Sequence, residues 1–213
     1  MKILKKFIYF IIILSCFALF SSCRDREIKN VSTEIELSDE NGGGTGILAN
    51  NKTADFYFYY PENFSIQRND DMIIVSSGES ADVETDIQEP GSDDYFPILT
   101  RTSLSATVFG LIAGKYETVD EYWGNYVLPA YEGMYQTIEI LSEDDLVIDK
   151  DTENIPAKKY TYAVSLAGMK YKLSEVIFFR KQKVYTLTYT STENKYSDHV
   201  KVLNTAVDTF RFK

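Results

Sequence analysis

Strict alternation of apolar and polar side chains in the last third of the chain restricts the fold more than any other feature. The apolar positions are Tyr160, Tyr162, Val164 and Leu166, then Tyr171, Leu173 and Ile177. Since successive residues of a strand point to opposite faces, this spacing predicts two strands that each carry one apolar face. We expect turns at 167–168 and near 181–183, with a further strand at 184–189. Strands joined by turns this short pair antiparallel.

Earlier in the chain, aromatic and β-branched residues predict four more strands. Residues 54–60 read ADFYFYY, and a long strand rich in Thr, Ser and Leu is expected at 97–109. Between them, residues 64–68 and 72–76 predict a hairpin, because the intervening residues 69–71 (NDD) favour a turn.

Helical spacing replaces strand alternation in two segments. Thr118 is suited to cap a helix, and Glu121 follows it as in a capping box. The apolar residues of this helix are Val119, Trp123, Val127 and Leu128, and Pro129 leaves its end open. A second helix is expected to begin at Thr192, with an apolar stripe of Tyr196, Val200, Leu203, Val207 and Phe210. Both stripes need a surface to cover, so the sequence predicts an α+β sandwich with helices flanking a central antiparallel β-sheet.

The N-terminus has the pattern of an export signal. Lys2, Lys5 and Lys6 precede a 14-residue apolar run at 7–20, and small residues follow the run. Because a membrane-spanning helix needs roughly 20 apolar residues, a cleaved signal peptide at 1–22 is favoured over a transmembrane segment.

The tetrapeptide at 20–23 (FSSC) resembles the bacterial lipobox, with phenylalanine in place of the usual leucine. The resemblance implies that Cys23 carries a covalent diacylglyceryl group, which anchors the mature lipoprotein to the cell membrane on the extracytoplasmic side. A competing match at 13–16 (ILSC) has fewer apolar residues before it, and an unmodified Cys23 is the plain alternative. Removal of the signal also removes Cys16, so no disulfide within the chain is expected.

The charge of the chain argues against a nucleic-acid partner. The chain has 22 Lys and Arg against 32 Asp and Glu; the signal takes three basic residues and no acid, which leaves 19 against 32, or −13. Nucleic acids are bound mainly through cationic neutralisation of their phosphates. The partners that we expect are therefore the membrane, through the lipid, and an envelope protein complex.

The polar residues 24–53 are expected to form a flexible tether between the lipidated Cys23 and one domain at 54–213. A glycine-rich stretch at 42–46 resembles a phosphate-binding loop only superficially, because the Gly-Lys-Ser/Thr ending is missing.

We expect no catalytic site and no cofactor other than the lipid. His199 is the only histidine, and with Cys23 acylated neither a His-based zinc site nor a Cys–His pair can form. His199 itself lies at the edge of the last apolar stripe, where a partly packed side chain is expected. A carboxylate-based hydrolase is the remaining enzymatic alternative, although no spacing singles out a carboxylate pair.

One acidic stretch offers oxygen ligands for calcium. Its residues are Asp82, Glu84, Asp86, Glu89, Asp93 and Asp94, and their spacing differs from that of an EF-hand. A solvated loop and a weak metal site are both open interpretations, and the solvated loop is favoured.

Aromatic residues are the other candidate binding feature. The positions that we single out for partner binding are Tyr116, Tyr122, Trp123, Tyr126 and Tyr131. Tyrosine combines a large contact area with a polar tip, as protein interfaces require. Packing against the sheet is the alternative explanation, and it suffices for most tyrosines of the chain.

Three segments together resemble the superfamily of PsbP-like, Mog-type and DcrB-type proteins. They are 58–66 (FYYPENFSI), 184–189 (VYTLTY) and 207–210 (VDTF), and the resemblance spans about residues 54–213. It implies a central antiparallel sheet flanked by helices, in agreement with the periodicity. It implies little about activity, because members include photosystem assembly proteins, partners of a small GTPase and envelope lipoproteins. Two functions stay open: a non-enzymatic binding or assembly module, and a ligand- or calcium-binding envelope lipoprotein.

Overall fold

The computed structural model describes residues 31–41, 43–51, 54–69, 72–80, 101–110, 115–166 and 168–213. The expected signal peptide, the expected lipid site at Cys23 and the acidic stretch at 82–94 lie outside the described residues. What the sequence indicates about them therefore stays a prediction.

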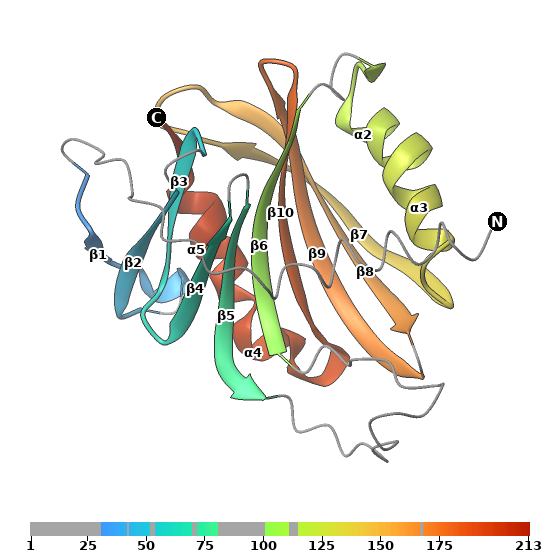
Figure 1. Cartoon of the computed structure of the whole chain (residues 1–213), viewed down its shortest axis with the longest axis horizontal. Helices are drawn as coiled ribbons and strands as arrows, with labels where there is room; N and C mark the ends of the chain where they lie inside the picture. The colour runs from blue at the N-terminus through green and yellow to red at the C-terminus, as the bar shows by residue number, and fades with distance from the viewer. Residues whose placement is uncertain are drawn as a thin grey trace.

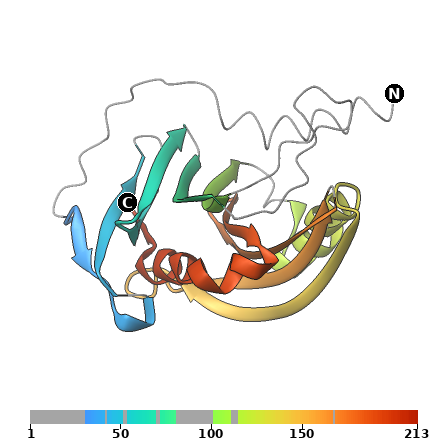
Figure 2. The ribbon, with the colours of Figure 1, turned by 90° about the horizontal axis from the view of Figure 1, so that it is seen from below.

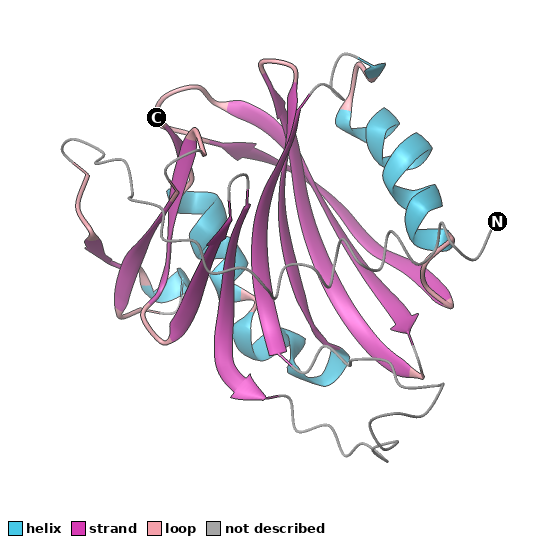
Figure 3. Ribbon diagram, in the orientation of Figure 1, coloured by secondary structure: helices cyan, strands magenta, loops and turns pink. Residues whose placement is uncertain are grey.

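Two antiparallel sheets make up most of the described structure (Figures 1 and 3). The larger sheet comprises β4 (Phe64–Asn69), β5 (Met72–Ser80), β6 (Arg101–Gly110), β7 (Thr137–Ile148), β8 (Ile155–Leu166), β9 (Met169–Arg180) and β10 (Lys183–Thr192). Its strand order is β4-β5-β6-β10-β9-β8-β7, and Figure 2 shows that it curls. The smaller sheet comprises β1 (Glu34–Glu36), β2 (Thr45–Asn50), β3 (Phe56–Pro61) and β11 (Arg211–Phe212), in the order β1-β2-β3-β11. The antiparallel pairing is as predicted, whereas the sequence indicated one sheet and not two.

The strands predicted in the last third of the chain are confirmed as β8, β9 and β10. Their pairing places Tyr162 opposite Leu173, so the two predicted apolar faces coincide. Gly168 closes the first turn with φ +77°, and Lys181 and Gln182 form the second with φ +47° and +63°. Two consecutive left-handed residues are typical of the tight turns that match the twist of a hairpin.

The hairpin predicted around residues 69–71 is also confirmed. β4 and β5 pair antiparallel, with Asn69 opposite Met72 at the closed end. β5 in turn pairs with β6, which lies next to β10. The hairpin therefore extends the larger sheet, while β3, which precedes it directly, belongs to the smaller one.

Residues that we expected to form the tether contribute instead to the smaller sheet. β2 pairs with β3, placing Ile47 opposite Tyr60, and β1 pairs with β2. Between β1 and β2, the chain forms the short 3-10 turn η2 (Asp39–Asn41). A Cβ on Gly46 would lie 2.7 Å from a side-chain carbon of Leu37. Glycine at this position therefore allows the side chain of Leu37 to pack closely against the backbone. The prediction failed because backbone hydrogen bonds hold this edge, and they need no sustained apolar period.

The C-terminal helix covers one face of the sheets but is not continuous. It consists of η5 (Glu193–Lys195), α4 (Tyr196–His199) and α5 (Lys201–Thr209). Thr192 precedes η5 as predicted, but its side chain makes no capping hydrogen bond. All five residues of the predicted stripe join the core: Tyr196, Leu203 and Phe210 are buried in it, and Val200 and Val207 pack against it. His199 is partly packed, as expected, with its ring edge-on to Phe64 at 5.9 Å.

Phe210 lies where the C-terminal helix meets both sheets. Its ring stacks on Phe56 at 5.0 Å and meets Phe178 edge-on at 5.2 Å, and it is 1% exposed. Phe56 comes from the smaller sheet and Phe178 from the larger one. This side chain therefore joins three elements of the core.

We predict that Phe210→Ala lowers the free energy of unfolding by about 3 to 5 kcal/mol, because it removes buried surface and leaves a cavity. Leu141→Ala, at a side chain that is 45% exposed on β7, is the matched control and should change it by less than about 0.5 kcal/mol. Urea unfolding of both variants measures the difference. Similar losses in the two variants would contradict the assignment of Phe210 to the core.

Candidate functional site

A second helical segment packs on the larger sheet. It comprises α2 (Val119–Tyr122), the π-helical turn η4 (Trp123–Val127) and α3 (Leu128–Glu132). The predicted cap is confirmed, because the Thr118 hydroxyl accepts the backbone N–H of Glu121 at 3.1 Å. The Glu121 carboxylate accepts the backbone N–H of Glu117 at 2.9 Å, one residue before the cap. We call residues 116–135 the aromatic segment.

The π-helical turn explains how the helix passes Pro129. The backbone N–H of Leu128 bonds to the carbonyl of Trp123, five residues earlier. Proline has no N–H to donate and its ring crowds the carbonyl four residues before it, so a wider turn relieves the strain. The helix then continues to Glu132, which settles the end that the sequence left open. Single π-helical turns are frequent at functional sites.

Trp123 packs the aromatic segment against β8. Its ring stacks on that of Tyr160 with centroids 4.1 Å apart and an interplanar angle of 4°. The Tyr160 hydroxyl donates to Asp120 of α2 at 2.7 Å, and the Lys158 ammonium lies 3.5 Å from the same carboxylate. The contact therefore combines a buried aromatic stack with a polar rim.

The five aromatic residues that we predicted as a partner-binding face are brought together by the fold. Tyr116, Tyr122 and Trp123 are buried, Tyr131 is half-buried and Tyr126 is 45% exposed. The ring of Tyr126 stacks on that of Tyr122 with centroids 5.4 Å apart, and Tyr122 rests edge-on against Phe179 of β9. Four of the five side chains are thus buried or half-buried, and Tyr126 is the most exposed of the five.

Beneath the segment lies a carboxyl group that the sequence analysis missed. Glu175 of β9 is 4% exposed and stands between Tyr160 of β8 and Thr188 of β10 in the sheet register. It occupies the same face as Leu173 and Ile177, so it is an ionisable residue in the middle of an alternating apolar series. That interruption was the signal by which the sequence could have revealed it.

In the described structure, the hydrogen-bond partners of the Glu175 carboxyl are hydroxyl groups. The Tyr131 hydroxyl lies 3.3 Å from both of its oxygens. The Tyr162 hydroxyl donates to Oε2 and the Thr188 hydroxyl to Oε1, each at 3.3 Å. Among the described residues, no cation forms an ion pair with this carboxyl. We call Glu175, Tyr131, Tyr162 and Thr188 the carboxyl cluster.

Burial determines the protonation of this cluster. It raises the pKa of Glu175 to about 7, and the hydrogen bonds from Thr188, Tyr162 and Tyr131 offset only part of the effect. Burial also raises the pKa of Tyr131 and Tyr162 well above the ordinary value, so their hydroxyls stay protonated. Glu175 therefore gains or loses a proton near neutral pH while its partners do not.

The carboxyl cluster can bind and release one proton, on Glu175. Its donors reach one carboxyl from the aromatic segment and two strands, and neither an imidazole nor a second carboxylate touches it in the described structure. No group of three or more His, Cys, Asp or Glu is arranged to hold a metal within the described ranges. Likewise, no helix of the described residues has both the length and the apolarity that a membrane span requires.

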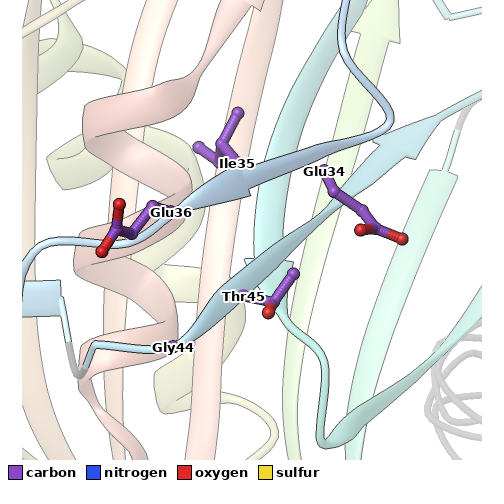
Figure 4. Close-up of a pocket in the computed structure, with 5 residues that line it drawn as sticks. All are labelled: Glu34, Ile35, Glu36, Gly44 and Thr45. Carbon is purple, nitrogen blue, oxygen red and sulfur yellow. The ribbon is translucent and has the colours of Figure 1, made fainter.

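A surface hollow lies far along the chain from this cluster. It is lined by Glu34, Ile35, Glu36, Gly44 and Thr45 of the β1–β2 edge (Figure 4). None of the predicted binding residues lines it. The carboxyl cluster and the exposed ring above it remain the candidate site.

No family model matches this chain, and no curated protein matches it. Among solved structures, LpqN of Mycobacterium tuberculosis, described as involved in cell envelope biogenesis, is 9% identical with a TM-score of 0.51, covering 79% of this chain and 85% of that one. CyanoP, the PsbP of the cyanobacterium Synechocystis, is 10% identical with a TM-score of 0.49 over 91% and 98%. PA94 of Pseudomonas aeruginosa, of unknown function, is 15% identical with a TM-score of 0.47 over 75% and 91%. The likeness to LpqN shows the fold alone.

We predict that Glu175→Gln removes the part of the pH dependence of the unfolding free energy that comes from the raised pKa of Glu175. The folded state holds its proton up to a pKa of about 7 and the unfolded state only up to the ordinary 4.5, so the folded wild type binds the extra proton between these values. Stability of the wild type therefore falls as pH rises through this window, by about 3 kcal/mol, and changes no further above it.

Urea unfolding at pH 4.5 and pH 8 measures this effect. The free energy of unfolding of Glu175→Gln, relative to wild type, should rise by about 3 kcal/mol between the two pH values. Glu132→Gln, at an exposed residue of α3, should run parallel to wild type. Parallel behaviour of Glu175→Gln would show that this carboxyl titrates normally.

Proposed function

We propose that this chain is a lipid-anchored lipoprotein of the cell envelope whose domain, an α/β/α sandwich of PsbP-like type, acts on the extracytoplasmic side as a non-enzymatic binding or assembly module. The observation that carries the binding role is Tyr126, an exposed ring stacked on the buried Tyr122 and presented by a π-helical turn. A ring held in this way loses little conformational entropy when a partner covers it.

The envelope assignment has two supports. The N-terminal pattern with Cys23 at its end is that of an exported lipoprotein. In addition, LpqN, whose description places it in cell envelope biogenesis, has a similar fold. Fold similarity alone is a weak guide to function, so the lipid site has to be tested directly.

A binding role is favoured over catalysis by the state of the most perturbed carboxyl. Glu175 is buried beneath the aromatic segment, and hydroxyl groups occupy the positions around it. A general acid or base has to come within hydrogen-bond reach of its substrate. The carboxyl cluster offers a substrate no such approach while the segment is docked.

We predict that Cys23→Ser releases the mature protein in soluble form, because it removes the sulfur that would carry the lipid. Membrane and soluble fractions probed with an antibody against the domain measure the distribution. Cys16→Ser is the matched control and should stay in the membrane fraction, since residue 16 lies within the expected signal peptide. A Cys23→Ser protein that loses its signal yet stays in the membrane fraction would overturn the anchor.

We predict that Tyr126→Ala loses partners that wild type retains in a pull-down from detergent-solubilised membranes. The substitution removes an exposed ring and leaves Trp123 and Tyr122 in place. Leu141→Ala, at the other large apolar side chain that is exposed in the described structure, is the control and should keep the wild-type partners. Identical partner sets for all three proteins would show that Tyr126 is not needed for partner binding.

A further inference from the structure

Tyr131 is the polar link between the aromatic segment and the centre of the larger sheet. Its hydroxyl reaches both oxygens of the buried Glu175 carboxyl, each at 3.3 Å. The other helix-to-sheet contact of comparable size is the stack of Trp123 on Tyr160. The docking of this segment therefore depends on one aromatic stack with its surrounding core and on two carboxyl–hydroxyl contacts: Tyr131 with the buried Glu175, and Tyr160 with Asp120 at the rim.

The groups that face Glu175 carry no compensating charge. They are Tyr122, Tyr131 and Tyr135 of the aromatic segment, Tyr160 and Tyr162 of β8, and Thr188 of β10. The β6 positions paired with 186–190 are residues 103–107, and none of them is an ionisable residue type. Within the described structure, a negative charge on Glu175 would thus be held by hydroxyl dipoles alone, at 3.3 Å, which is longer than the usual O–H···O distance of about 2.5 to 3.0 Å.

We propose that Glu175 and Tyr131 form a proton-controlled latch: the protonated carboxyl favours the docked aromatic segment, and its ionisation favours release of the segment from β8 and β9. An ionised carboxylate gains hydration if the segment lifts and water reaches it, whereas a neutral carboxyl gains far less. The segment is one short helical stretch, from Val119 to Glu132, whose register changes at a π-helical turn.

Linkage sets the size of the effect. If the lifted state returns the carboxyl to its ordinary pKa of 4.5 from about 7, the equilibrium constant for lifting rises by up to about 300-fold as pH increases through this window. This increase in the equilibrium constant for lifting is nearly complete above pH 7 and small below pH 4.5. The latch rests on the carboxyl cluster alone, so it stands or falls independently of the lipid anchor and of the partner at Tyr126.

Hydrogen exchange of the mature protein tests the latch. In wild type, amides of residues 119–132 should be less protected than those of β9 and β10, and their protection factors should fall by up to about 150-fold between pH 4.5 and pH 8. In Glu175→Gln, which keeps a neutral side chain at every pH, this fall should be absent. Glu132→Gln should behave as wild type. Exchange of the segment with the same free energy as β9 and β10 at every pH would overturn the latch.

Trp123 provides a second and independent readout. It is the only tryptophan of the chain and is 4% exposed in the docked segment. Quenching of its fluorescence by acrylamide should increase in wild type between pH 5 and pH 8. In Tyr131→Phe, which keeps the ring but removes a hydroxyl that favours the ionised carboxyl, the midpoint should move to higher pH. Quenching that is independent of pH in wild type, or an unchanged midpoint in Tyr131→Phe, would contradict the proposal.

Discussion

Burial of β9 on both of its faces is the constraint on which the rest of the structure depends. Val176 and Phe178 pack with the C-terminal helix in one core cluster, while Leu173 and Ile177 pack with the aromatic segment in another. A strand that is buried on both faces needs a cover on each side, so neither helical element is dispensable. Its neighbours β8 and β10 then extend the sheet in both directions, with β7 beyond β8 and with β6, β5 and β4 beyond β10.

Glu175 is an exception to this packing, and it costs stability in its ionised form. An apolar residue at the same position would fill the series begun by Leu173 and Ile177, because burial of an unpaired carboxylate is unfavourable. The fold places three hydroxyl groups around it and, among the residues that the structure describes, no cation forms an ion pair with it, so neutralisation by a proton reduces the cost. The same arrangement that weakens the core above neutral pH makes the aromatic segment responsive to protons. Tyr126, the exposed ring on that segment, would then be presented differently in the two protonation states.

Periodicity and turn chemistry predicted most of the larger sheet. The alternation at 160–177 and the residues of the turns were sufficient, because strand faces and hairpin turns depend on local sequence. The capped helix after Thr118 was likewise a local prediction. The smaller sheet was missed, since β1 and β2 pair through backbone groups in a polar, glycine-rich stretch that resembles a tether. The last strand of this sheet, β11, follows the C-terminal helix and pairs with β3, which lies far from it in the sequence, so no local pattern contains this contact.

By itself, the sequence determined the strands of the last third, the apolar stripes of both helical elements and the five aromatic residues gathered in one segment. It also supplied the hydroxyl and carboxyl groups of the candidate site, but as isolated residues at 131, 162, 175 and 188. Only the tertiary structure decided that these residues meet, because Tyr131 reaches Glu175 across the interface between a helix and a sheet. It also decided that Trp123 is a packed side chain and that Tyr126 is the exposed one, since exposure depends on which elements cover a residue and not on the residue type.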